Sequence, residues 1–86
     1  MRVVKFNAIW CSGCIVMKNA MKDVEKMYPD FTYESYDYDM DTDMVSKYNV
    51  GDILPVLIFF KDDNEVSRLI GEKTKKEIIK EIERIA

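Results

Sequence analysis

The two cysteines of this 86-residue chain lie three positions apart, in the segment Trp10-Cys11-Ser12-Gly13-Cys14. In a helix that begins at Cys11, residues i and i+3 share one face of the first turn, so the two sulfurs can form and break a disulfide with little backbone movement. Unpaired N–H groups and the helix dipole at that end favour negative charge, which lowers the pKa of the Cys11 thiol. The spacing therefore predicts a redox-active dithiol.

Three other interpretations of the cysteine pair compete with this one: half of a zinc site, a small structural disulfide, and two inert thiols. Zinc sites usually take four Cys or His ligands, and the sequence has two cysteines and no histidine, so one chain cannot supply a closed site. A disulfide that closes so short a loop constrains the unfolded chain very little. A C-x-x-C pair beside a strand–helix–strand pattern in a cytosolic protein favours redox chemistry.

Length and composition predict a single domain over residues 1–86, with enough hydrophobic residues (48%) for one compact core. Thirteen Lys and Arg against 16 Asp and Glu give a net charge of −3, which provides no general attraction to nucleic acid or to an anionic membrane. No apolar run approaches the ~20 residues that span a bilayer. We find no secretion signal after Met1 and expect a cytoplasmic protein.

Hydrophobic periodicity predicts seven elements in the order β-α-β-α-β-β-α. The predicted strands cover residues 3–9, 31–39, 56–60 and 65–70. The predicted helices cover residues 11–28, a short segment through Met44, Val45 and Tyr48, and the segment after Thr74. A βαβ half followed by a ββα half gives an α/β fold, a four-stranded mixed sheet with helices on both faces.

Apolar stripes and capping residues define the predicted helices. The stripe of the first helix comprises Val16, Met17, Ala20, Met21, Val24, Met27 and Tyr28. Asp41 or Thr42 is expected to cap the short second helix. Thr74-x-x-Glu77 is the pattern of a capping box, and the buried stripe of the last helix is predicted to comprise Ile78, Ile79, Ile82 and Ile85.

Four segments together resemble the thioredoxin family, and the resemblance covers nearly the whole chain. Residues 8–14 resemble its active-site segment, including the tryptophan before the first cysteine. Leu54-Pro55-Val56 resembles its cis-proline loop, and Phe60-Lys61, a turn and Glu65-Val66 resemble the hairpin that follows. Gly71 matches the glycine before the last helix. The resemblance implies a minimal thioredoxin fold and a thiol–disulfide oxidoreductase.

The resemblance also implies roles for the residues around the cysteines. Cys11 attacks a substrate disulfide and Cys14 resolves the mixed disulfide. A cis bond would bring Pro55 against the sulfurs and turn the Leu54 backbone toward an extended substrate chain, although a generic X-Pro bond is most often trans.

The other residues matched to the active site have simpler expected roles. Trp10 is expected to cover the site and contact partners, or to lie in the core. Ser12 is expected to be a solvated turn residue or to donate to the Cys11 thiolate. Gly13 is expected to leave space for the backbone between the cysteines. Gly71 is expected to support the active site.

The departures from the family pattern concern the acid–base device. Ser12-Gly13 replaces the usual Gly-Pro between the cysteines, and the family's extra N-terminal strand and helix have no counterpart. Lys5 stands where the family has a buried acid, and Ser35 stands at the usual partner lysine. Lys5 is either a strand lysine whose amine reaches solvent or a cation that lowers the pKa of the Cys14 thiol. Asp37 and Asp39 either pair with Lys5, replace the missing base, or are ordinary paired or solvated acids.

The expected partners are disulfide-containing protein substrates and a reductase such as thioredoxin reductase. We expect a monomer whose redox group is the Cys11–Cys14 disulfide, with no cofactor and no metal. One alternative is a glutaredoxin-like enzyme that uses glutathione. The other is a non-enzymatic module: an adaptor, or a dimer that shares a metal or iron–sulfur cluster between two C-x-x-C pairs.

Overall fold

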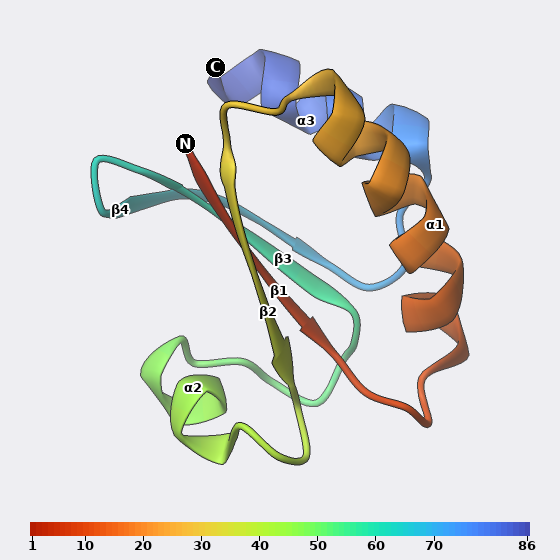
Figure 1. Ribbon diagram of the computed structural model, residues 1–86. Coiled ribbons are helices and arrows are strands. Elements are labelled where there is room, and N and C mark those ends of the chain that lie inside the picture. Colours follow the sequence, from red (N-terminus) through yellow and green to blue (C-terminus); the bar gives the residue numbers. More distant parts are fainter.

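The computed structural model describes residues 1–86 and contains seven elements in the predicted order (Figure 1). The strands are β1 (Arg2–Asn7), β2 (Thr32–Asp37), β3 (Val56–Lys61) and β4 (Asn64–Ile70). The helices are α1 (Ser12–Met27), α2 (Thr42–Lys47) and α3 (Lys75–Ile85). None of the three helices has the length and apolar content needed to cross a membrane.

The strands form one mixed sheet in the order β2-β1-β3-β4, with β1 parallel to β2 and antiparallel to β3. β1 is thus one of the two inner strands. Antiparallel pairing sets Phe6, near the end of β1, opposite Val56, the first residue of β3. Pro55 therefore lies at the same end of the sheet as the segment that leads from β1 into α1.

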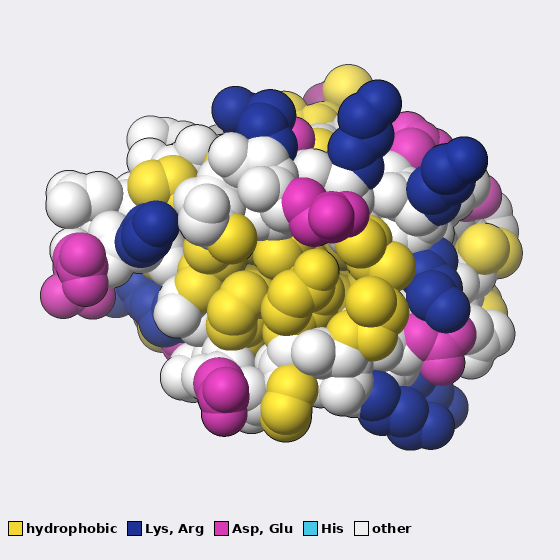
Figure 2. Space-filling view, turned by 90° about the horizontal axis from the view of Figure 1, so that it is seen from above, with side chains coloured by type: hydrophobic (Ala, Val, Ile, Leu, Met, Phe, Trp, Pro, Cys, Tyr) yellow, Lys and Arg dark blue, Asp and Glu magenta, His cyan; other side chains and the backbone are white.

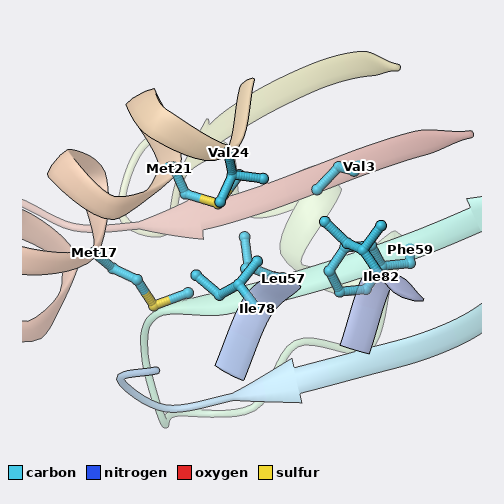
Figure 3. Close-up of a cluster of buried hydrophobic side chains, with 8 residues drawn as sticks. All are labelled: Val3, Met17, Met21, Val24, Leu57, Phe59, Ile78 and Ile82. Carbon is cyan, nitrogen blue, oxygen red and sulfur yellow. The ribbon is translucent and has the colours of Figure 1, made fainter. Parts of the chain in front are cut away.

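One face of the sheet is covered by α1 and α3 and the other by α2, which confirms the predicted fold class (Figure 1). Strand residues alternate between the two faces because successive side chains point in opposite directions. Figure 3 shows the core under α1 and α3, which consists of Val3, Met17, Met21, Val24, Leu57, Phe59, Ile78 and Ile82. The core under α2 consists of Val4, Phe6, Val50, Val56, Ile58 and Phe60.

The predicted strand over residues 3–9 is too long, because β1 ends at Asn7. Ile9 lies in a turn and is 88% exposed. The chain must reverse here to enter α1, and the Cys11 N–H closes this turn on the Ala8 carbonyl oxygen at 3.1 Å. An apolar sequence alone did not distinguish a strand residue from an exposed one.

The predicted strand over residues 31–39 is also too long, because β2 ends at Asp37. One Asp37 carboxylate oxygen accepts the N–H groups of Asp39 (2.8 Å) and Met40 (3.0 Å), and this closes a turn. Aspartate favours such turns because its short side chain reaches backbone N–H groups two residues on.

The predicted stripe of α1 is partly wrong. Met17, Met21 and Val24 are buried, but Val16 and Met27 are 56% and 51% exposed. The residues of α1 that are buried follow one narrow line of i+3 and i+4 steps, which leaves Val16 and Met27 outside the contact with the sheet.

The two predicted caps have different outcomes. Asp41 occupies the N-cap position of α2, but its carboxylate accepts the Asp37 N–H (2.8 Å) instead of a helix N–H. The capping box of α3 is confirmed, because Thr74 Oγ1 accepts the Glu77 N–H and the Glu77 carboxylate accepts the Thr74 N–H.

Both chain termini lie at the end of the sheet opposite the N-terminal turn of α1 (Figure 1). Figure 2 views this end and shows hydrophobic side chains gathered in the centre, with Lys, Arg, Asp and Glu around them. The ring centroids of Tyr28 and Phe31, at the connection from α1 to β2, are stacked 5.0 Å apart. The N-terminal turn of α1, which contains the two cysteines, lies at the other end of the sheet (Figure 1).

Candidate active site

Cys11 is the N-cap residue of α1, so the helix begins where the sequence predicts. Its backbone is extended, and its Sγ accepts the N–H of Cys14 at 3.2 Å. Cys11 and Cys14 form a disulfide with their Cα atoms 5.3 Å apart. The sulfur of Cys11 thus satisfies one of the unpaired N–H groups that every helix leaves at this end.

The two cysteines are equally buried in this disulfide form, because each is 7% exposed. Ala8 is buried beside the two cysteines, and Tyr38 and Leu54 pack against this cluster. Ser12 is exposed and its hydroxyl makes no hydrogen bond to Cys11. Position at the helix end, and not exposure, is therefore what distinguishes Cys11 from Cys14.

The Leu54–Pro55 peptide bond is cis, as the resemblance implies. Pro55 is buried next to the first turn of α1, where its Cδ lies 3.6 Å from the place of a Cβ on Gly13. The N–H and C=O of Leu54 make none of the backbone hydrogen bonds in the structure. The loop before β3 therefore offers a free backbone amide beside the disulfide.

Gly71 joins β4 to the same site. It has a φ of +91°, which only glycine adopts readily, and its N–H donates to the Pro55 carbonyl oxygen at 2.8 Å. The structure thus brings together three matched segments: the cysteine turn, the Pro55 loop and the Gly71 connection.

Trp10 is 59% exposed, so the interpretation of a core tryptophan is wrong. Its Nε1–H donates to the Asp39 carboxylate at 2.7 Å, and its ring contacts Tyr38 edge-on with the centroids 6.3 Å apart. Asp39 is therefore the partner of Trp10 and not of Lys5. The indole forms part of the rim around the disulfide.

Lys5 does not pair with Asp37 either. The Lys5 Nζ lies 3.5 Å from a Glu25 carboxylate oxygen on α1, and Asp37 is occupied by its own turn. The Lys5 side chain is 20% exposed and lines a cavity of about 30 Å³ that Cys14 and Pro55 also line. Ser35 lies directly opposite Lys5 in the sheet. The missing acid of the family pattern is thus replaced by a paired cation.

Three residues of the site escaped sequence reasoning: Glu25, Tyr38 and Glu72. Glu25 lies on the polar face of α1, and nothing local to it indicates contact with β1. Tyr38 follows β2 and reaches the cysteines only because the chain turns there. Glu72 lies beside Gly13, and its place directly after the matched Gly71 is the one sequence signal that pointed to it.

A sheet between two layers of helices, with a disulfide at a helix N-terminus beside a cis-proline, defines a thioredoxin-fold protein. The thioredoxin family model matches residues 1–84. Thioredoxin H5 of Oryza sativa subsp. japonica is 35% identical over 69 residues, which are 80% of this chain and 50% of that protein. The thioredoxin of Chlamydia pneumoniae is 34% identical over 73 residues, which are 85% of this chain and 71% of that protein.

A solved structure agrees with these relatives. Fasciola hepatica thioredoxin is 28% identical, with a TM-score of 0.89 over 99% of this chain and 80% of that one. This chain belongs to the thioredoxin family. It spans half the length of the rice relative and 61% of the length of a similar thioredoxin, H7 of Arabidopsis thaliana.

Proposed function

We propose that this protein is a thiol–disulfide oxidoreductase that reduces disulfides of protein substrates through Cys11 and Cys14. The observation that carries the proposal is the disulfide between the N-cap residue and the first turn of α1, next to Pro55. Membership of the thioredoxin family supports it.

Cys11 performs the first step. In the reduced protein its thiolate is stabilised by the positive end of α1 and by the Cys14 N–H. The thiolate attacks one sulfur of the substrate disulfide. A new S–S bond joins Cys11 to the substrate, and the second substrate sulfur leaves as a thiolate and takes up a proton.

Cys14 performs the second step. Its thiol loses a proton and attacks Cys11 Sγ, which forms the Cys11–Cys14 disulfide and releases the first substrate sulfur as a thiolate. Two electrons have then passed from the protein to the substrate. The Cα separation of 5.3 Å accommodates the bond in the present backbone. A reductase, such as thioredoxin reductase, returns the two electrons.

Substrate binding is assigned to the rim of the site. The N–H and C=O of Leu54, which make no backbone hydrogen bond, pair in this proposal with an extended substrate chain in the manner of an added strand. Trp10, which is held by Asp39, offers an apolar surface beside the sulfurs. We place the protein, as a monomer, in a compartment that keeps the pair reduced, such as the cytoplasm.

Lys5 is included as a residue that tunes the Cys14 thiol. It lines the same cavity as Cys14, and a cation near a thiol favours the thiolate. Its ion pair with Glu25 opposes this effect, so the expected influence is small. Asp37 is not included, because both N–H groups that it accepts belong to its own turn.

Trapping of the mixed disulfide tests the order of the two steps. Cys14→Ser removes the resolving thiol, so this variant should accumulate a covalent complex with a disulfide-containing protein such as insulin. Cys11→Ser removes the nucleophile and should form none. Non-reducing electrophoresis followed by mass spectrometry identifies the complex. The opposite pattern in the two variants would reverse the roles of the cysteines.

A paired assay tests the electron donor. Insulin reduction is followed with NADPH and thioredoxin reductase, and then with NADPH, glutathione and glutathione reductase. We expect turnover in the first system. Turnover only in the second indicates the glutaredoxin-like alternative, and visible absorbance of the purified protein indicates a shared cluster.

A further inference from the structure

Glu72 lies against the turn that separates the two cysteines. A Cβ added to Gly13 would lie 3.0 Å from the Glu72 Oε1 atom and 3.3 Å from its Cβ. Both distances are tighter than most Cβ contacts, so a side chain at position 13 would require Glu72 to shift by a few tenths of an ångström. Glu72 is therefore in close contact with the backbone of Gly13.

The backbone on both sides of Glu72 is anchored. The Gly71 N–H donates to the Pro55 carbonyl oxygen at 2.8 Å, and the Lys73 N–H donates to Met17 Sδ at 3.4 Å. Figure 1 shows this connection, between β4 and α3, running beside α1. Glu72 is thus held at the site by its neighbours in the chain and not by its own side chain.

The Glu72 carboxylate has no partner of its own. It takes part in none of the five ion pairs of the structure, and it is exposed. The first turn of α1 contains no acidic residue. Glu72 therefore places a negative charge that no side chain pairs with beside Gly13 and Pro55. A chain bound to the sulfurs and to the Leu54 backbone would lie next to these residues.

We propose that Glu72 is a specificity-determining residue that favours substrate disulfides flanked by Lys or Arg and disfavours anionic ones such as glutathione disulfide. The inference rests on the function proposed above, whose two exchange steps it leaves unchanged. A positive side chain next to the reactive cysteine approaches Glu72, whereas a negative one is repelled. One exposed charge pair alters a rate constant by about two- to fivefold.

Peptide disulfides test this directly. Three homodimers of one short peptide carry Lys, Gln or Glu next to the cysteine. The reduced wild-type protein and Glu72→Gln each reduce them in single turnover at low salt, and every rate constant is divided by that of dithiothreitol with the same peptide. This division removes the intrinsic reactivity of each disulfide. Any change in the Cys11 thiolate affects all three peptides equally and cancels in the Lys-to-Glu ratio.

We expect Glu72→Gln to lower the Lys-to-Glu ratio by about two- to fivefold and Glu72→Lys to lower it further. The ratio of the wild type should also fall at high salt. Glu83→Gln is the matched control, because it removes the same charge from an exposed position of α3. It should leave the ratio unchanged.

The outcomes separate this inference from the proposed function. Normal reduction of the Gln peptide with an unchanged ratio in Glu72→Gln overturns the inference and leaves the function standing. Equal losses in Glu72→Gln and Glu83→Gln also overturn it, since they reflect net charge alone. Wild-type protein that reduces none of the peptides overturns the function, and the inference with it.

Discussion

The N-terminal turns of α1 and α3 have the same local geometry but different roles. In each, the N-cap side chain accepts the N–H of the residue three positions on at 3.2 Å: Cys11 Sγ from Cys14, and Thr74 Oγ1 from Glu77. The two turns differ in the interaction that the side chain of Glu77 or Cys14 makes with the N-cap residue. The Glu77 carboxylate accepts the Thr74 N–H, whereas Cys14 forms a covalent bond with Cys11.

Because of this difference, the α3 turn only stabilises its helix, whereas the α1 turn contains a redox-active group. The α3 turn satisfies two unpaired N–H groups at once and contains no reactive atom. The α1 turn satisfies one of them with a sulfur, and reduction of the disulfide leaves that sulfur at the positive end of the helix. The favourable electrostatics of a helix N-terminus thus stabilise the fold in α3 and are proposed to stabilise a nucleophile in α1.

The largest expected effect separates capping from chemistry within α1. Serine is a good N-cap residue, so Cys11→Ser should keep the helix and change the free energy of unfolding by less than about 1 kcal/mol relative to reduced wild type. Reduction of insulin disulfides should fall to background, because the hydroxyl is not a nucleophile for disulfides. Circular dichroism, urea unfolding and the insulin assay measure the three quantities. A variant that unfolds would show that the sulfur itself is needed for the α1 cap.

The next effect concerns the α3 turn alone. Thr74→Ala removes the cap, which should lower the free energy of unfolding by about 1 kcal/mol. The reduction potential of the Cys11–Cys14 pair should not change, because Thr74 belongs to the other helix. Urea unfolding and equilibration with glutathione buffers measure these values, and Thr74→Ser is the control that retains the cap. A shift of the potential would mean that the two turns are coupled.

Sequence reasoning succeeded where a feature is local. The order of the elements, the start of α1 at Cys11 and the capping box at Thr74 depend on residues within one turn of each other. The cis bond before Pro55 followed from the resemblance and not from its physics. Local patterns were also enough to place the buried run of β3.

The strand ends were missed because of local turns, whereas the charges around the cysteines were missed because they depend on contacts between segments far apart in the chain. Lys5 finds its partner Glu25 only when α1 packs across the sheet, 20 residues on. Glu72 meets Gly13 only when the Gly71 connection is anchored to Pro55. No pattern of neighbouring residues encodes these pairs, so sequence alone predicted the cysteines and the Pro55 loop but not the charges around them.

A smaller effect tests the charge beneath α1. Lys5→Met removes a cation that lines the same cavity as Cys14, so the pKa of the Cys14 thiol should rise. The pair with Glu25 keeps the change small. Titration of the reduced protein by cysteine-selective NMR measures this pKa, and Lys5→Arg is the control that keeps the charge. An unchanged Cys14 pKa in Lys5→Met would make Lys5 a structural residue only.

The smallest effect tests the α3 turn by its pH dependence. Hydrogen bonds from the backbone and hydroxyl of Thr74 hold the pKa of Glu77 below its ordinary value. A carboxyl group whose pKa is lowered by folding stabilises the protein above its unfolded pKa, and this contribution is lost as the pH falls through the folded pKa. The melting temperatures of wild type and Glu77→Gln should therefore differ near pH 7 and converge in acid. Glu83→Gln, whose carboxylate lies outside the capping box, should show no such convergence. If the Glu77→Gln difference persists in acid, the α3 turn is stabilised by its geometry and not by its charge, and the contrast with the α1 turn is then sharper.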